Sequence, residues 1–529
     1  MQVTKVMTNT RRAPGLAALA LAVAALAPLA APCHSARADD IPARPEQLKF
    51  PPLTFAAPRA ADYRVTLGNG VVAYLVPDRD LPLVTVNVLM RIGPDLDPAG
   101  KEGVAATMVN LLTRGGTTTR TAIQVEDRVA FLGAVLESGT GGGGGGPFGG
   151  GGPPIGGSES RATLNLLSKD IDEGLVLLVD CLKNPAFQDD RLTLRKDQLL
   201  QSMKQRNDES AQIEEREFGF LMRGDGHWSN RYTTEASVKG ITGDELMAFH
   251  KRFVGPKNFI LAVSGDFDRA AMVKKLEKAF AKWPTPGERP GAPAAPAAAA
   301  SAGWFMVDKA VNQGRVSLGI RGIQRDDPDL YAMRIMNDIL GGGGFTSRLV
   351  NRIRSDEGLA YQVGTRLGEG VYYAEPFRLI FQSKVRSVAY ALQIASAELG
   401  KMRDTLVTPD ELETSQNGFI EAFPTQFATA SAIAGLLAVD ELTGRYQKHP
   451  AFWAEYRDKL RAVTAADVQR VARRLLDPAK MSVLMVGDTK EIMLGDPKHE
   501  DAKIVAMAGG EPKHLPLRDP MTMKPMANP

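Results

Sequence analysis

The strongest constraint on the fold is a pattern that occurs twice along the chain. The run ITGDELMAFHKRFVGPKNFILAVSGD spans residues 241–266, and VTAADVQRVARRLLDPAKMSVLMVGD spans residues 463–488. Each run begins with a capped helix, passes through a proline-marked turn into an apolar strand, and ends on Gly-Asp. The two runs begin about 220 residues apart, a period that is too long for a solenoid and is typical of two duplicated domains.

Strand and helix patterns before the first run indicate the fold class. Residues 66–76 (TLGNGVVAYLV) indicate two strands around an Asn-Gly turn, and alternation over residues 83–93 indicates another strand. Helical periodicity follows over residues 103–116, and residues 189–222 predict one long polar helix. Strands interleaved with helices predict an α+β fold, in which each half has a mainly antiparallel sheet packed with helices.

The first residues have the composition of a secretory signal peptide. Lys5, Arg11 and Arg12 precede an Ala/Leu run, and Ala-Arg-Ala stands at residues 36–38. Removing residues 1–38 takes away four basic groups and no acidic group, so the formal charge falls from +3 to −1. No basic stripe or long apolar run remains. We therefore expect a periplasmic protein with no nucleic-acid partner and no stable membrane span.

Composition sets further boundaries along the chain. A segment rich in Pro and Ala lacks core-forming residues and is typical of a semi-rigid linker between two halves. A final segment rich in Met, Pro and Lys has no clear pattern, and we expect it to be loose. The predicted segments are a signal peptide at 1–38, a Pro-rich leader at 39–60, an N-terminal half at 61–283, a linker at 284–301, a C-terminal half at 302–490 and a tail at 491–529.

A glycine-rich insertion interrupts the N-terminal half. Residues 139–157 read GTGGGGGGPFGGGGPPIGG and lie between two strand patterns. A phosphate-binding P-loop needs a Lys-Ser/Thr pair that opens a helix, and no such pair is present. The composition predicts a disordered hairpin tip. The alternative is a mobile flap that contacts substrate or a partner subunit.

The most informative stretch for function is LGGGGFTSRLVNRIRSDEGLAY, from Leu340 to Tyr361. Arg354 and Tyr361 are seven residues apart, one near a predicted helix end and the other at a predicted strand start. A guanidinium fork could bind a peptide carbonyl or carboxylate, and a phenol could donate a hydrogen bond beside it. A surface Arg and a half-buried strand Tyr would be the non-functional interpretation. The glycine run before them consists of Gly341, Gly342, Gly343 and Gly344.

This stretch resembles the signature of the second half of pitrilysin-type (insulinase-superfamily) zinc metallopeptidases, and most resembles the processing-peptidase branch. The likeness extends from about Tyr63 to Asp488. The resemblance implies two similar halves facing each other around a chamber. It also implies that Arg354 and Tyr361 contact the substrate backbone and polarise the scissile carbonyl. The glycine run and Phe345 would then let the substrate backbone approach.

The same resemblance implies that a zinc motif has been lost. The family's first half has an inverted motif, His-x-x-Glu-His, whose two His residues share a zinc ion and whose Glu activates the bound water. Alignment places Ala106 and Asn110 at the His positions and Val109 at the Glu position, with Ser202 at or near a third ligand. These side chains cannot replace the ligands. We therefore expect no metal in this chain and zinc in a partner subunit.

Other chemistry competes poorly. No G-x-S-x-G nucleophile elbow occurs. Cys181 lies on an apolar helix face and is typical of a small core residue rather than a nucleophile. His227 stands in a Gly-flanked loop beside Trp228, and we interpret it as a loop His that stacks near that ring.

Three functions follow from these observations. The first is a zinc-free subunit of a two-chain metallopeptidase, in which Arg354 and Tyr361 bind peptide substrate and complete the site of a zinc-bearing homologue in a heterodimer. The second is a non-catalytic peptide-binding or scaffold protein of the same fold. The third is a self-sufficient peptidase with an unrecognised site.

Overall fold

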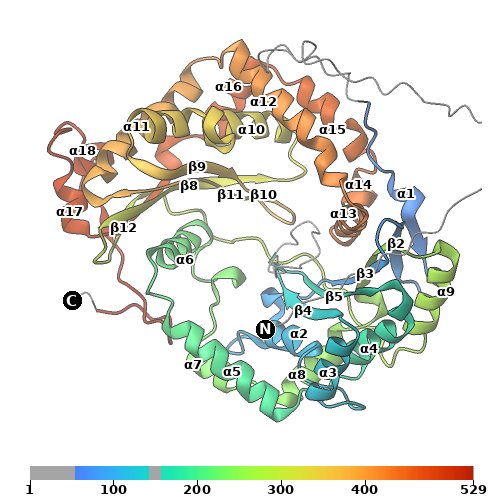
Figure 1. Cartoon of the computed structure of the whole chain (residues 1–529). Helices are drawn as coiled ribbons and strands as arrows, with labels where there is room; N and C mark the ends of the chain where they lie inside the picture. Colours follow the sequence, from blue (N-terminus) through green and yellow to red (C-terminus); the bar gives the residue numbers. More distant parts are fainter. Residues whose placement is uncertain (1–53, 142–156, 528–529) are drawn as a thin grey trace, which may run out of the picture. The chain divides into compact units, whose positions relative to one another are not determined.

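The computed structural model describes residues 54–141 and 157–527. The predictions for the signal peptide, most of the leader and most of the glycine-rich insertion therefore lie outside the described residues. From Phe55 onward the chain forms one compact unit with two mixed β-sheets packed with helices (Figure 1). The predicted fold class is confirmed.

The first sheet has the strand order β1-β2-β6-β3-β5-β4. Its neighbouring strands are antiparallel except β2 and β6, which run parallel. Strand β3 is buried along nearly its whole length, because both faces of the sheet are covered. The strands are β1 (Arg64–Thr66), β2 (Val72–Pro77), β3 (Leu83–Met90), β4 (Val135–Thr140), β5 (Ser160–Leu167) and β6 (Phe259–Gly265).

Helices of the N-terminal half cover one face of this sheet. Apolar side chains of four of them, α2, α4, α8 and α9, share one core with alternate residues of β2, β3, β5 and β6. Helix α3 packs outside α4. The helices are α2 (Val104–Leu112), α3 (Ala122–Phe131), α4 (Ile171–Lys183), α8 (Gly243–Phe253) and α9 (Arg269–Phe280).

The second sheet has the order β13-β7-β12-β8-β11-β9, with the short strand β10 beside β8. Strand β12 pairs parallel with β7, and so do β13 with β7 and β10 with β8, whereas the longer pairings of β8, β9, β11 and β12 are antiparallel, so this sheet is mixed. The strands are β7 (Gly303–Asp308), β8 (Gln313–Gln324), β9 (Ala360–Leu367), β10 (Glu369–Gly370), β11 (Glu375–Lys384), β12 (Ser482–Gly487) and β13 (Lys513–His514).

The helices of the second half gather on one face of the second sheet (Figure 1). They begin with α10, which is followed by a turn of π-helix that leads into the glycine run. The helices are α10 (Leu330–Asn337), α11 (Val388–Asp404), α12 (Pro409–Ala422), α15 (Phe452–Arg461) and α16 (Ala465–Leu475).

The two repeated runs adopt equivalent structures. Thr242 and Thr464 each form a capping box at the start of a helix, and each helix leads through a 3-10 turn into a buried strand. These strands, β6 and β12, each run parallel to one neighbour and antiparallel to the other. The duplication predicted from the sequence is therefore present in the topology as well.

Each half also places one helix on the sheet of the other half. Helix α6 (Ser210–Arg223) comes from the N-terminal half and packs on β12 and β8, opposite α10 and α11 (Figure 1). Helix α13 (Ala430–Leu442) comes from the C-terminal half and packs on β2, β3 and β6. The single long helix predicted over residues 189–222 is wrong: α5 (Asp189–Lys204) ends before a turn, and α6 starts in a new direction.

Buried carboxylates fasten both exchanged helices. On α13, Glu441 accepts hydrogen bonds from Tyr74 Oη at 2.8 Å and from Arg64 Nε at 3.0 Å. On α6, Glu214 accepts hydrogen bonds from Ser317 and Arg378 of the second sheet. Tyr74 is fully buried, so its hydroxyl depends on Glu441 for a partner.

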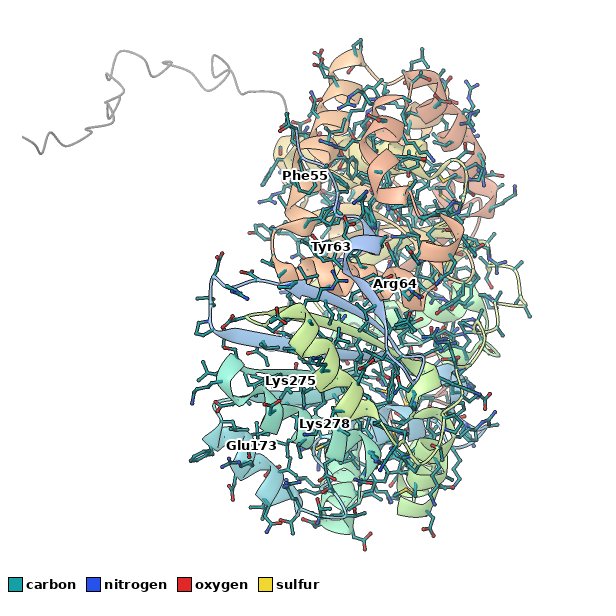
Figure 2. All side chains as sticks on the ribbon, turned by 90° about the vertical axis from the view of Figure 1, so that its right-hand side faces the viewer. Phe55, Tyr63, Arg64, Glu173, Lys275 and Lys278 are labelled. Atoms are coloured by element: carbon teal, nitrogen blue, oxygen red, sulfur yellow. The ribbon has the colours of Figure 1, made fainter. Side chains whose placement is uncertain are left out.

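The segment before the first sheet reaches the C-terminal half. The Phe55 ring lies 5.7 Å from Phe427 and 6.0 Å from Phe423, centroid to centroid. Figure 2 shows Phe55 beside the helices of that half and Arg64 at the boundary with the first sheet. The described end of the predicted leader is therefore part of the packed structure.

The linker and the tail are also tied to the protein. Glu288 accepts from Arg252 Nε at 2.9 Å, and the Gly291 carbonyl accepts from Arg91 at 3.2 Å. The tail was expected to be loose, but the Leu515 amide donates to Met306 at 2.8 Å and Arg518 pairs with Glu217 at 3.2 Å. Met and Pro side chains in the tail gave no periodic signal for these contacts.

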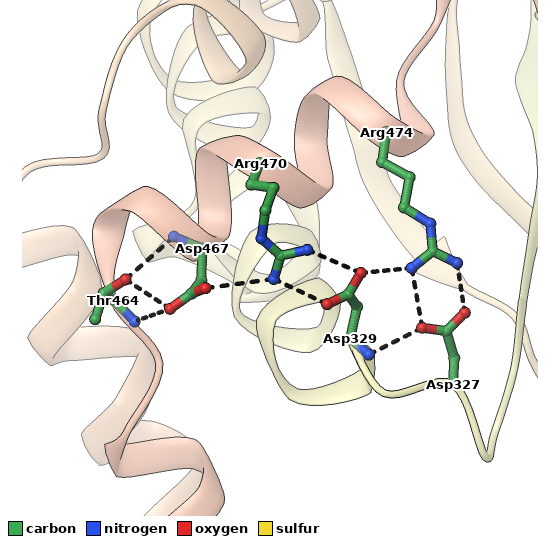
Figure 3. Close-up of polar contacts among 6 residues, drawn as sticks. All are labelled: Asp327, Asp329, Thr464, Asp467, Arg470 and Arg474. Atoms are coloured by element: carbon green, nitrogen blue, oxygen red, sulfur yellow. Dashed lines mark hydrogen bonds and ion pairs between the residues drawn. The ribbon is translucent and has the colours of Figure 1, made fainter.

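An ion-pair ladder holds α16 against the loop that precedes α10 (Figure 3). Arg470 pairs with Asp329 at 2.8 Å, and Arg474 pairs with Asp327 at 2.6 Å. The guanidinium of Arg470 is the largest cause that lowers the pKa of Asp329. Because the arginines are about half exposed, this network contributes modestly to stability.

Among the described residues, no single helix has the length and hydropathy to cross a membrane. Two consecutive helical segments would be long and apolar enough only if they were counted as one span. They are Pro409–Phe427 and Ala430–Leu442, and the chain bends by 101° between them.

We predict that Glu441→Ala lowers the free energy of unfolding by about 3 kcal/mol, because it leaves the Tyr74 hydroxyl and the Arg64 guanidinium without their shared partner. Urea denaturation measures this loss. As a matched control, Glu455→Ala removes a carboxylate whose pair with Lys459 is half exposed, and it should cost less than about 0.5 kcal/mol. Equal losses in the two variants would contradict a special role for Glu441.

Candidate functional site

Helix α2 presents the residues aligned with the lost zinc motif. Asp97 fixes its first turn, because the carboxylate accepts from the Gly103 amide at 2.8 Å and from the Ala105 amide at 2.7 Å. Ala106 is half-buried and lines a cavity, whereas Val109 is fully buried in the core of the first half. The three aligned positions thus share one helix, but Val109 faces away from the cavity.

The cavity beside Ala106, which we call the α2 cavity, has a volume of about 670 Å³. Residues from both halves line it, including Asp97 from the loop before α2 and Tyr372 and Tyr373 from the loop before β11. Tyr372 donates a hydrogen bond to Glu159 at 2.7 Å, which ties the two halves together at its edge. Of the four positions aligned with the zinc motif, Ala106 alone belongs to its lining.

The residues at the aligned zinc-motif positions do not fit a zinc ion. Ala106 and Val109 have no donor atom, and the neutral amide of Asn110 is a weak ligand. Ser202 is exposed on α5, donates to the Leu199 carbonyl at 2.9 Å, and is absent from the cavity lining. Within residues 54–141 and 157–527, no three His, Cys, Asp or Glu side chains lie together as a metal site would require.

Burial perturbs the ionisable groups of this cavity. It raises the pKa of Asp97 to about 6, against the lowering effect of the two backbone amides. Burial also lowers the pKa of His227, which bridges the linker and the second half. One ring nitrogen of His227 lies 3.1 Å from the Ala294 carbonyl, and its ring meets Tyr373 edge to face at 5.4 Å. Its ring also lies 5.3 Å from Trp228, as the sequence predicted.

Arg354 lies between two aromatic rings. Its guanidinium carbon is 4.6 Å from the centroid of Phe345 and 4.6 Å from that of Tyr361. Tyr361, the second residue of β9, is 77% exposed, and Phe345 is 68% exposed. The structure therefore brings together three of the residues that the sequence selected, and Tyr361 is not the half-buried strand residue of the non-functional interpretation.

The guanidinium of Arg354 has no competing partner. In the part of the chain that the structure describes, its side chain makes ring contacts but no hydrogen bond or ion pair. Arg352, two residues earlier, is instead paired with Asp356 at 2.6 Å. The N–H groups of Arg354 are thus available to an external acceptor, while the rings restrict the plane of the guanidinium.

A second cavity of about 460 Å³ contains this trio, and we call it the Arg354 cavity. Gly344 belongs to its lining together with Phe345, Arg354 and Tyr361. Gly344 has a φ of 61°, a left-handed conformation that glycine adopts without strain.

The other three glycines of the run, Gly341, Gly342 and Gly343, are absent from that lining and pack closely against the protein itself. A Cβ at Gly341, for example, would lie 2.9 Å from the Thr365 amide nitrogen. Only the last glycine therefore borders the space that a ligand would enter.

Sequence reasoning missed several residues of the Arg354 cavity. Arg315 on β8 and Arg366 on β9 line it, and so does Glu214 on the exchanged helix α6. Strand alternation would have placed each arginine on one face of a strand, but it could not have shown which strands meet. Glu214 gives no signal in the sequence, because it is one of many charged residues in a segment that predicts a long polar helix.

The two cavities have different linings. The α2 cavity contains Ala106, and the Arg354 cavity contains Arg354 and Tyr361, with no residue in common. Helix α6 contributes to both, through Glu215 and Glu214 respectively.

Comparison with known proteins shows what this chain is similar to. The family model described as "Peptidase M16 inactive domain" matches residues 240–419. An uncharacterized zinc protease of Mycobacterium bovis is 26% identical over 450 residues, which cover 82% of this chain and 94% of that protein.

Solved structures share the fold. The peptidase M16 inactive domain from Pseudomonas fluorescens superposes with a TM-score of 0.69 at 22% identity, covering 80% of this chain and 97% of that one. The periplasmic protease PqqL from Escherichia coli superposes with a TM-score of 0.64 at 14% identity, covering 83% of this chain and 47% of that one.

The raised pKa of Asp97 predicts a pH dependence. The folded state binds the proton more tightly than the unfolded state, whose reference pKa is 3.8. The contribution of Asp97 to the free energy of unfolding should therefore fall by about 3 kcal/mol as the pH rises from about 4 to about 6. Urea denaturation of the wild type and Asp97→Asn across this range measures the difference. A constant difference would contradict the prediction.

The alignment of the lost motif can be tested by restoring two ligands. If Ala106 and Asn110 occupy the two His positions, the double variant Ala106→His/Asn110→His should bind zinc through two rings one helical turn apart. Zinc at tenfold its dissociation constant should then stabilise this variant by about 1.4 kcal/mol. Thermal unfolding with and without zinc is the measurement, and Asn110→His alone is the control. An equal zinc response in the control would refute the alignment.

Proposed function

We propose that this chain, which is similar to proteins of the M16 peptidase family, is the zinc-free subunit of a two-chain metallopeptidase. In this proposal Arg354 and Tyr361 bind the peptide substrate and complete the active site of a zinc-bearing homologue. The chain contributes no metal ligand and requires no cofactor of its own.

The observation on which the proposal rests is the state of Arg354. Its guanidinium is held between Phe345 and Tyr361 at 4.6 Å from each ring, in a cavity, with its N–H groups unused by the described residues. An arginine with only a structural role is normally paired, as Arg348 is with Glu411 at 2.6 Å. A restricted guanidinium with free donors suits recognition of a carbonyl or carboxylate oxygen.

The proposed chemistry follows from these donors. A peptide carbonyl that enters the cavity would accept a hydrogen bond from the Arg354 guanidinium, and the exposed Tyr361 hydroxyl would donate beside it. Donors that are already in place stabilise the negative charge that develops on a carbonyl oxygen during hydrolysis. Zinc and the water that attacks the carbonyl would come from the partner, because Ala106, Val109 and Asn110 cannot supply them.

The length of PqqL is consistent with a partner subunit of about the same size as this chain. The shared fold accounts for 83% of this chain but only 47% of the chain of PqqL. That protease therefore has room for a second module of this size within one chain. We propose that a separate homologous subunit supplies the second module here.

We place this complex in the periplasm. The proposal rests on the signal-like composition of residues 1–38 and on the structural similarity to PqqL, a periplasmic protease.

A non-catalytic role is the second candidate, and the α2 cavity favours it. Ala106 and Val109 remove the metal chemistry of the first half, so the fold could bind peptides, or support an assembly, without hydrolysis. A pull-down of the protein from its native periplasm separates the two candidates. Recovery of a zinc-bearing relative, with peptidase activity that needs both chains, supports the two-chain enzyme. Recovery of the chain alone, without activity, supports the non-catalytic role.

We predict that Arg354→Ala reduces the kcat/KM of the two-chain enzyme by about 10²–10³, the loss typical of removing one oxyanion donor. Tyr361→Phe keeps the ring against Arg354 and removes only the hydroxyl, so a comparable loss would assign the effect to hydrogen bonding. Subunit association, measured by analytical ultracentrifugation, should not change.

Arg352→Ala is the matched control, because Arg352 is two residues away and already paired with Asp356. It should leave turnover at the wild-type level. Wild-type turnover in both Arg354→Ala and Tyr361→Phe would eliminate the shared-site mechanism.

A further inference from the structure

The Arg354 cavity contains three arginines without a carboxylate partner. Arg315, Arg354 and Arg366 all line it, and in the described ranges none of them forms an ion pair or a side-chain hydrogen bond. From this uncompensated charge we propose that the cavity binds acidic peptide segments, through Asp or Glu side chains or a C-terminal carboxylate. The inference rests on the proposed function and adds the class of substrate.

Strand register places two of these arginines on the same face of the sheet. Arg366 lies opposite Arg378 on β11, and Arg315 lies opposite Gln382. Arg378 contacts α6, because its guanidinium lies 4.6 Å from the Phe218 ring. Residues paired across antiparallel strands point to the same side, and residues two apart along one strand do so too. Arg315 and Arg366 therefore face the side of the sheet where α6 and the cavity lie.

The only acidic residue of the cavity lining is already neutralised. Glu214 accepts hydrogen bonds from Arg378 and from Ser317. Its carboxylate therefore fastens α6 to the second sheet and does not neutralise the charge of Arg315, Arg354 or Arg366.

Two nearby arginines have carboxylate partners, unlike the three arginines of the cavity. Arg334 pairs with Glu369 at 2.5 Å, and Arg348 pairs with Glu411 at 2.6 Å. Both belong to the same half and are largely buried by their partners. Three unpaired guanidinium groups in one cavity of about 460 Å³ thus mark a site for an external anion.

The shape and lining favour a peptide over other anions. A volume of about 460 Å³ is within the range of small-ligand pockets and suits a few side chains. Ile380 adds apolar surface on the face of the arginines, and the exposed rings of Phe345 and Tyr361 line the same cavity. A peptide offers carboxylates and apolar side chains on one chain, which matches this mixed lining.

Direct peptide binding tests the inference without the partner subunit. The probes are a short fluorescent peptide rich in glutamate and a second peptide with glutamine at each glutamate, measured by anisotropy with the purified protein. We expect the acidic peptide to bind at least about tenfold more tightly, since one charged hydrogen bond contributes about that factor. This preference should weaken as NaCl rises from about 0.05 to about 0.3 M.

Substitutions outside the Arg354–Tyr361 pair assign the effect. The double variant Arg315→Gln/Arg366→Gln should weaken binding of the acidic peptide by about 10–100-fold and leave the glutamine peptide unchanged. Arg79→Gln is the matched control, because Arg79 is exposed, lies in the loop after β2 and does not line either cavity. Circular dichroism confirms that each variant is folded.

Each outcome bears on a different claim. Equal binding of the two peptides, or a double variant that behaves like Arg79→Gln, would overturn the preference for acidic segments and leave the two-chain proposal intact. Tighter binding of a single-stranded oligonucleotide of equal charge would overturn the peptide assignment. Loss of two-chain turnover in Arg354→Ala, measured separately, concerns the proposed function alone.

Discussion

The reciprocal packing of α6 and α13 is the interaction on which the rest of the structure depends. Each helix leaves its own half and covers the sheet of the other, so neither half buries its second sheet face alone. Buried carboxylates fix both helices, Glu441 to Tyr74 and Arg64, and Glu214 to Ser317 and Arg378. A buried carboxylate that loses its partners destabilises the fold. These contacts therefore fix how the two halves pack against each other.

The same exchange builds the two cavities. Helix α6 supplies Glu215 to the α2 cavity and Glu214 to the Arg354 cavity. A shift of α6 would change both linings at once and would release Arg378 from Glu214. The position of the proposed substrate-binding arginines relative to the degenerate zinc helix is therefore a consequence of how one helix packs across the halves.

The two cavities differ in chemistry as well as in position. On α2, the aligned positions Ala106 and Val109 have no atom that could bind a metal, and Ala106 borders the α2 cavity. Near β9, Arg354 keeps free donors and a fixed plane between two rings. Loss of metal ligands on one side and retention of placed donors on the other fit a subunit that assists chemistry located elsewhere.

The sequence by itself determined the duplication, the capped helices at Thr242 and Thr464, and the candidates Arg354 and Tyr361. The duplication and the capped helices depend on local pattern and spacing, whereas the resemblance to a known family singled out Arg354 and Tyr361. Only the tertiary structure decided that residues 189–222 break into α5 and α6, that the tail is held by Arg518, and that Arg315 and Arg366 join Arg354. Such contacts join residues from different strands and halves. In the sequence, the polar side chains of α6 look like those of a solvent-exposed helix. They are buried only because residues far away in the sequence pack against α6 in the folded protein.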